Sequence, residues 1–166
     1  MKKISTLFKS SVFVLAGLLG TTNSSAQITE NFDNITTLTT AGWSMQNLST
    51  PIGTQANWFQ GNATVFPAFN GATTSYIAGN FNFVAGANTI SGWLITPNVT
   101  LRNGDVITFY SRKVAPDTYP DRLEVRMSTN GASTNVGTTS ASVGDFTTLL
   151  MTINPTLVTG VYPGAW

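Results

Sequence analysis

The sequence predicts an all-β fold of the antiparallel jelly-roll sandwich class, and three observations predict it. The turn-forming residues Gly, Asn, Ser and Thr recur every few positions, and no window shows the sustained apolar period of an amphipathic helix. Arg122 to Ser128 (RLEVRMS) alternates charged and apolar residues, which is typical of a strand buried on one face. About eight such short segments, separated by turn residues, fit two antiparallel sheets packed face to face.

Residues 1–26 precede the predicted domain and have the pattern of a secretory signal peptide. Three lysines come before an apolar run from Val12 to Leu19, and the small residue Ala26 offers a cleavage site before Gln27. The run is shorter than the roughly 20 apolar residues that span a bilayer. We therefore expect it to be removed, so that residues 27–166 form one domain without a membrane span.

The expected strands are short, rich in β-branched and aromatic residues, and bounded by turn residues. In chain order they are Ile28 to Phe32, Trp43 to Leu48, Ser75 to Ala78, Gly92 to Thr96, Asp105 to Lys113, Arg122 to Ser128 and Phe146 to Ile153. The turn dipeptide Asn103-Gly104 comes just before one of them, in which Ile107 and Phe109 oppose Thr108 and Tyr110. This alternation predicts a strand with one buried face.

The connection from Leu48 to Tyr76 is long for this fold class and carries the candidate ligand-binding residues. These are four aromatic residues among Asn, Gly and Gln, namely Trp58, Phe59, Phe66 and Phe69. We expect an ordered loop that either folds over a sheet edge or forms a binding rim. Trp58 and Phe59 either contact a ligand or anchor the loop, whereas the apolar run around Trp93 favours core packing for that ring.

The composition argues against most catalytic chemistry and against nucleic-acid binding. The chain has no histidine and no cysteine, which excludes a Ser-His-Asp triad, a His-ligated zinc site and a cysteine nucleophile. Asp121 and Glu124 are three positions apart in a predicted strand, so their carboxylates point to opposite faces and do not form a glycosidase pair. Cleavage before Gln27 would leave five basic and seven acidic residues, too weak a basic balance for phosphate binding. We expect a protein that is not an enzyme.

Charged residues are concentrated in one stretch of the chain. Between Gln27 and Leu101 only Glu30 and Asp33 are charged, whereas nine charged residues lie between Arg102 and Arg126. The simplest interpretation is that two neighbouring strands share a solvated face with cross-strand ion pairs.

Five ordered sequence blocks resemble the choice-of-anchor J domain, a family of bacterial extracellular modules related to cleaved-adhesin and MAM-like jelly rolls. The blocks are WFQGNATVFPAFNG (Trp58 to Gly71), SYIAGNFN (Ser75 to Asn82), SGWLITPNVTL (Ser91 to Leu101), DRLEVRMSTNG (Asp121 to Gly131) and VGDFTTLLMTINP (Val143 to Pro155). The resemblance covers nearly all of Ile28 to Trp166. The family's pattern continues past the tryptophan of YPGAW with further strands, so we expect a fragment whose jelly roll is incomplete at the C-terminus.

The resemblance implies a secreted, non-catalytic module for adhesion or recognition at the surface of a bacterium. It implies an extracellular protein or glycan as the ligand, and further domains of a larger exported protein as partners. The alternatives are a carbohydrate-binding module of a polysaccharide-active protein and a purely structural spacer. The fold class does not decide among the three.

Calcium is the only cofactor that the resemblance suggests. Related jelly rolls often join their first and last strands through a calcium ion, and Glu30 and Asp33 are the acidic residues of the predicted first strand. Calcium takes six to eight oxygen ligands, which carboxylates, Asn side chains and backbone carbonyls supply. An N-terminal strand with solvated acids fits these two residues equally well.

Overall fold

The computed structural model describes residues 28–116 and 118–166, and the predicted signal peptide lies outside the described residues. In these ranges the chain forms strands and loops with two 3-10 turns, which agrees with the predicted all-β class. Six strands pair as three separate two-stranded antiparallel sheets. The sheets are β1 (Ser44–Asn47) with β4 (Gly92–Ile95), β2 (Phe59–Gln60) with β3 (Ile77–Ala78), and β5 (Leu123–Met127) with β6 (Thr148–Ile153).

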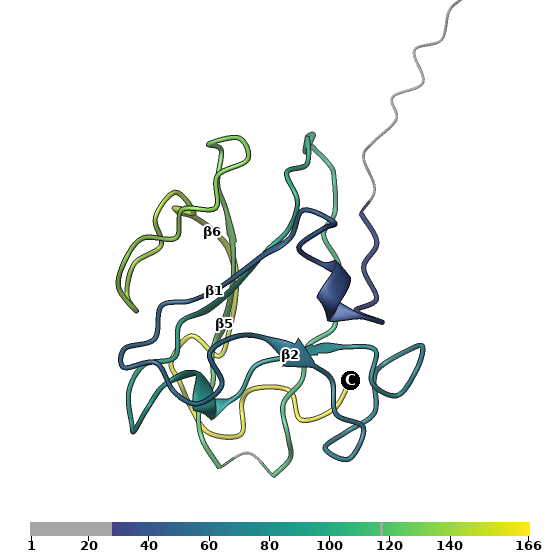
Figure 1. Cartoon of the computed structure of the whole chain (residues 1–166), viewed down its shortest axis with the longest axis vertical. Helices are drawn as coiled ribbons and strands as arrows, with labels where there is room; N and C mark the ends of the chain where they lie inside the picture. Colours follow the sequence, from purple (N-terminus) through teal and green to yellow (C-terminus); the bar gives the residue numbers. More distant parts are fainter. Residues whose placement is uncertain (1–27, 117) are drawn as a thin grey trace, which may run out of the picture.

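Figure 1 shows β5 and β6 on one side of the molecule and the 3-10 turn η1 (Ile35–Thr37) on the other, with β1 running diagonally between them. The second 3-10 turn is η2 (Phe81–Phe83), which follows β3. The C-terminus lies near β2, where the Trp166 indole Nε1 donates a hydrogen bond of 2.8 Å to the carbonyl oxygen of Pro67. The last residue is therefore joined to the long connection before β3.

Five of the predicted strands are confirmed, with shorter bounds, as β1, β3, β4, β5 and β6. The clearest is β5, where the alternating segment Arg122 to Ser128 pairs with β6. Its Leu123 and Val125 lie opposite Ile153 and Met151 of β6. A bulge then shifts the register, so that Arg126 lies opposite Leu149 and Leu150 is the extra residue.

The predicted strand at Asp105 to Lys113 is wrong, because its central residues pair with no other strand. Among the described residues, no backbone hydrogen bond involves Val106 to Tyr110. At the ends of the segment, the Asp105 amide donates to the Arg102 carbonyl and the Lys113 amide donates to the Pro163 carbonyl. The predicted buried face is wrong too, because Ile107 and Phe109 are exposed like Tyr110. The sequence alternates, but no neighbouring strand is there to pair with the segment or to cover one side of it.

The predicted first strand at Ile28 to Phe32 is also wrong. Phe32 has a φ of 56°, in the left-handed region, which ends any extended run there. The Glu30 carboxylate accepts the Phe32 amide at 2.7 Å, and Asn34 caps η1 by accepting the Thr36 amide at 3.1 Å. Side-chain acceptors therefore turn this segment where a strand was expected.

β2 lies inside the long connection and was not predicted. Its Gln60 carboxamide donates to the Phe32 carbonyl at 2.8 Å and to the Thr74 carbonyl at 2.6 Å, and it accepts the Ile35 amide at 3.0 Å. The Tyr76 hydroxyl also donates to the Asn62 carbonyl at 2.9 Å. The connection is thus an ordered loop, as predicted, and it is held against β3.

The buried core of the described residues is small and has one cluster. Ile95, Val136 and Phe146 form it, and Trp93 packs against it with its ring 5.6 Å from that of Phe146. Other buried side chains lie outside this cluster, including Leu38 and Phe83, and Phe83 is in edge contact with Trp58. Core packing of Trp93 is therefore confirmed.

Candidate functional site

A large cavity opens between the three sheets. Its volume is about 3350 Å³, and its lining includes residues of every sheet and of the unpaired segment 105–113. Small-molecule pockets usually measure about 300–1,000 Å³. This central cavity is lined by more than half of the described residues, so it is the loosely packed space between the sheets and does not outline a particular ligand.

Charged residues of both signs line this central cavity. All five basic residues of the described ranges line it, namely Arg102, Arg112, Lys113, Arg122 and Arg126. Only four of the six described acidic residues do so, namely Glu30, Asp105, Asp121 and Glu124. The cavity wall therefore carries a small excess of positive charge, although the described chain as a whole is slightly acidic.

Part of the wall is an aromatic patch made by segments far apart in the sequence. We define the aromatic patch as Phe66, Phe69, Tyr76, Tyr110 and Trp166. The rings of Phe69 and Tyr110 stack with centroids 3.6 Å apart, and those of Phe66 and Tyr76 stack at 4.9 Å. Trp166 makes an edge contact with Phe66 at 5.8 Å. The patch thus joins the long connection, the unpaired segment and the C-terminus.

Arg112 holds the patch together from one side. Its guanidinium lies 4.4 Å from the ring centroid of Phe66 and 5.6 Å from that of Trp166, within the range of cation–π attraction. Its Nη2 also donates to the carbonyl oxygen of Gly164. A half-buried arginine therefore fixes the C-terminus against the aromatic rings.

The outer rings of the patch are open to solvent while its base is not. Tyr110 is 64% exposed and Phe69 is 50% exposed, whereas Tyr76 is buried. Rings that are ordered by stacking and still accessible offer contact area at low cost in side-chain entropy. The arrangement suits binding through the faces of Phe69 and Tyr110.

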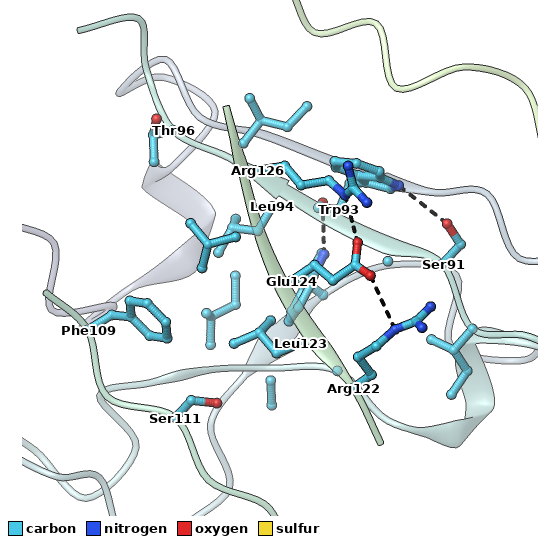
Figure 2. A pocket seen from close by; sticks show the side chains of 18 of the residues that line it. Ser91, Trp93, Leu94, Thr96, Phe109, Ser111, Arg122, Leu123, Glu124 and Arg126 are labelled. Atoms are coloured by element: carbon cyan, nitrogen blue, oxygen red, sulfur yellow. Dashed lines mark hydrogen bonds and ion pairs between the residues drawn. The ribbon is translucent and has the colours of Figure 1, made fainter. Parts of the chain in front are cut away.

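A second part of the wall is a row of charged side chains on β5 and on the residue just before it. We define the charged row as Arg122, Glu124 and Arg126, whose side chains converge in Figure 2. The Glu124 carboxylate bonds Arg126 Nε at 2.6 Å and lies 3.3 Å from Arg122 Nε. These ion pairs join residues two apart on one strand, which corrects the expectation of cross-strand pairs for this row.

Asp145 and Tyr162, within the described ranges, have shifted pKa values, and neither shift suits proton transfer at neutral pH. Hydrogen bonds from Ser133 and Asn130 lower the pKa of Asp145, which stays ionised. Burial raises the pKa of Tyr162, against the opposing effect of its hydrogen bond with Ser111, and the phenol stays protonated. A general acid or base works best with a pKa near the working pH, so both groups are better suited to structural roles.

The structure divides the four predicted ligand-binding residues into two pairs. Phe66 and Phe69 belong to the aromatic patch. Trp58 instead donates from its indole to the Trp93 carbonyl at 2.9 Å and packs on Phe83, which is the geometry of an anchor. Phe59 is paired with Ala78 in the sheet of β2 and β3.

Two residues of the aromatic patch were not predicted from the sequence. Tyr110 was placed on the polar face of an expected strand, and Trp166 was considered only as the end of a motif. Their proximity to Phe69 depends on contacts across 41 and 97 positions of the chain. In the sequence, the one signal for Tyr110 is its place on the exposed side of an alternating segment.

The two predicted calcium ligands bind separate partners. The Glu30 carboxylate accepts the Phe32 amide, and the Asp33 carboxylate accepts the Ser75 hydroxyl at 2.6 Å. Within the described ranges, no group of three or more acidic, His or Cys side chains could hold a metal ion. Calcium binding at Glu30 and Asp33 stays a prediction to which this geometry adds no support.

Comparison of the chain with protein-family models, curated proteins and solved structures gives no match. The resemblance to the choice-of-anchor J domain therefore stays a prediction that depends on its five sequence blocks. Over residues 28–116 and 118–166, no helix has the length and apolar character needed to cross a membrane.

Proposed function

We propose that this chain is a secreted, non-catalytic module for adhesion or recognition at a bacterial cell surface, within a larger exported protein. The proposal also covers the topology. We propose an antiparallel jelly-roll sandwich of the choice-of-anchor J type, of which the three small sheets are parts. The five sequence blocks support the family, and the signal-peptide pattern of residues 1–26 supports export. The lack of histidine and cysteine supports a role without catalysis.

One observation carries the proposed binding role: the stacked pair of Phe69 and Tyr110 stays half exposed or more. Aromatic side chains are enriched at binding interfaces, because they bury a large area and have few rotatable bonds. Exposed apolar clusters on a soluble domain commonly mark such interfaces.

A carbohydrate-binding module is the second candidate. Flat aromatic faces can pack against the apolar faces of sugar rings, and Tyr110 presents such a face beside the central cavity. A protein ligand would use the same rings as buried anchors. A structural spacer, the third alternative, would bind neither.

The test compares three single variants of the full chain on a glycan array and on a panel of immobilised extracellular proteins. Phe69→Ala and Tyr110→Ala each remove one ring of the stack, and we expect binding to fall about tenfold, the loss typical of an interface anchor. Val161→Ala is the control, because Val161 is 54% exposed and lies outside both the aromatic patch and the central cavity. Its binding should stay within about twofold of wild type.

The surface that retains the wild-type protein identifies the ligand as glycan or protein. Equal binding by all three variants would reject the aromatic patch as the binding surface. Absence of binding to every glycan and protein would favour the spacer.

A further inference from the structure

Residues 106–110 (VITFY) form a backbone segment without hydrogen-bond partners, which we call the open segment. The chain makes no turn or bend between residues 105 and 114. Among the described residues, no backbone amide or carbonyl group of the open segment takes part in a hydrogen bond. Backbone groups in this state are a template for pairing with another extended chain. The missing partner of the open segment is therefore a strand.

The side chains of the open segment also lack cover. Val106 is 80% exposed, and Ile107, Phe109 and Tyr110 are exposed as well. Ile107 and Phe109 line a gap of about 260 Å³ together with Val125 of β5 and two residues of β6. Because side chains of the open segment point at β5 and β6, these strands lie over one of its faces and not along its edge. They do not supply the missing backbone bonds.

The two ends of the open segment carry opposite charges. Asp105 lies just before it, and its carboxylate accepts the Arg102 amide at 2.7 Å. Arg112 lies just beyond its other end, where the guanidinium contacts carbonyl oxygens and the rings of Phe66 and Trp166. In the part of the chain that the structure describes, neither Asp105 nor Arg112 forms an ion pair. A second copy that runs antiparallel would bring opposite charges together at both ends, whereas a parallel one would bring like charges together.

We propose that the open segment is the docking edge for a second copy of this chain. The two open segments pair antiparallel about a twofold axis, which is the commonest symmetry of homodimers. Each copy supplies the backbone donors and acceptors that the other lacks, and Asp105 of one copy lies near Arg112 of the other. Five paired residues bury less than a standard interface, so we expect a weak dimer with a Kd of the order of 10–100 µM. This inference goes beyond the proposed recognition function and does not depend on it.

Sedimentation velocity of the full chain over a concentration series tests the association. We expect a reversible change from monomer to dimer, with a Kd that rises on addition of salt because the charges at the ends are screened. Hydrogen exchange measured by NMR at low and high concentration locates the contact. Alternate amides of the open segment should exchange at least about tenfold more slowly in the dimer, whereas the turn at Asn103-Gly104 should exchange alike in both states.

Two proline variants test the backbone pairing. Ile107→Pro and Thr108→Pro remove adjacent amides, which point to opposite edges of a strand, so at least one of them removes a bond to the second copy. That variant should raise the Kd at least about tenfold. Ile107→Val and Thr108→Val are the matched controls, because they keep the amide and a β-branched side chain, and should change the Kd less than about threefold. Circular dichroism checks that each variant keeps the wild-type fold.

A third variant tests the charges at the ends. Asp105→Asn keeps a side-chain oxygen that can accept the Arg102 amide, but it removes the negative charge. It should raise the Kd about three- to tenfold and make the Kd less sensitive to salt.

Four results would overturn the inference: a chain that stays monomeric at about 1 mM, a dimer whose open segment is not protected from exchange, a dimer unaffected by both proline variants, or association that continues beyond the dimer. The first would leave the open segment to a strand of a different protein, and the last would indicate a head-to-tail contact. Phe69→Ala separates this inference from the proposed function, because it removes a ring of the aromatic patch and keeps the open segment. Its dimer Kd should stay within about twofold of wild type while ligand binding falls.

Discussion

At the scale of single residues, Phe83 is the side chain on which packing around η2 depends most. It is 1% exposed and meets the edge of Trp58 at a ring distance of 5.6 Å. The backbone of Gly92 lies so close to its ring that a Cβ atom there would overlap it. Phe83 therefore sets the approach of β4, and a side chain at position 92 would push the ring away.

Replacing Phe83 with alanine should lower the free energy of unfolding by about 3–5 kcal/mol, because it removes a fully buried ring and leaves a cavity. Phe81→Ala is the matched control, since Phe81 lies two positions away and is 75% exposed. Chemical denaturation followed by tryptophan fluorescence measures both. Similar losses in the two variants would contradict the packing role assigned to Phe83.

Local sequence predicted the roles of some single residues and not of others. Trp93 stands in an uncharged apolar run, and core packing followed from that composition. Trp58 stands among polar residues, so its contact with the Trp93 carbonyl could not be distinguished from ligand binding before the fold was known. Tyr110 and Trp166 depend on tertiary contacts, for which one sequence contains no local signal.

At the scale of elements, Asp145 ties the loop after β5 to the residues before β6. Its carboxylate accepts from Ser133 Oγ at 2.6 Å, from Asn130 Nδ2 at 2.8 Å and from Asn135 Nδ2 at 3.3 Å. This loop carries the buried Val136, which packs in the core cluster. One carboxylate thus holds in place a loop that closes the core.

The stability of the protein should depend on the ionisation of Asp145. Hydrogen bonds from Ser133 and Asn130 lower its pKa in the folded state below the ordinary 3.8, whereas the unfolded chain lacks these donors. Its stabilising effect is therefore complete above pH 3.8 and is lost as the pH falls through the lower folded pKa. We expect Asp145→Asn to be less stable at neutral pH and to lose less further stability on acidification.

Denaturation of wild type and Asp145→Asn between about pH 6 and about pH 2 measures this difference. Ser140→Ala, on the same connection, is the control and should keep the wild-type pH profile. An identical acid-induced loss of stability in wild type and Asp145→Asn would show that the carboxylate does not favour the folded state.

Strand prediction succeeded where alternation and pairing coincide. β5 has a strict alternation and finds β6 as its partner. Segment 105–113 has a similar alternation but no neighbouring strand, and pairing is a property of the fold rather than of the segment. β2 was missed because Phe59 and Gln60 are too few to show a period, and the four hydrogen bonds of the Gln60 side chain join it to distant residues.

At the scale of the whole molecule, buried apolar surface is scarce and exposed apolar surface is extensive. The described residues contain eight buried hydrophobic side chains, against twenty large ones that are exposed. Several of the exposed ones lie on segment 105–113 and on β6, including Val106, Ile107 and Leu150. The free energy of unfolding is a small difference between large opposing terms, so the scarcity of buried apolar surface should make the folded protein only weakly stable.

A chain of residues 27–166 alone should therefore be poorly soluble or melt over a broad temperature range, and it should bind an apolar fluorescent dye in its folded state. Val106→Thr removes exposed apolar surface without touching the core and should reduce dye binding while leaving the midpoint of unfolding unchanged. Scanning calorimetry and dye fluorescence measure these properties. A sharp cooperative melt of a monomer that binds no dye would contradict the expectation.

The bulge in the sheet of β5 and β6 has a consequence for how related chains could diverge. The residues on the two sides of Leu150 lie on opposite faces of the sheet. Met151 lies opposite Val125, and Leu149 lies opposite Arg126. Loss of Leu150 would remove the bulge and keep both pairs, because Leu149 and Met151 would then be consecutive residues on opposite faces of the sheet. A deletion of this one codon could thus straighten the sheet without changing which side chains meet across it.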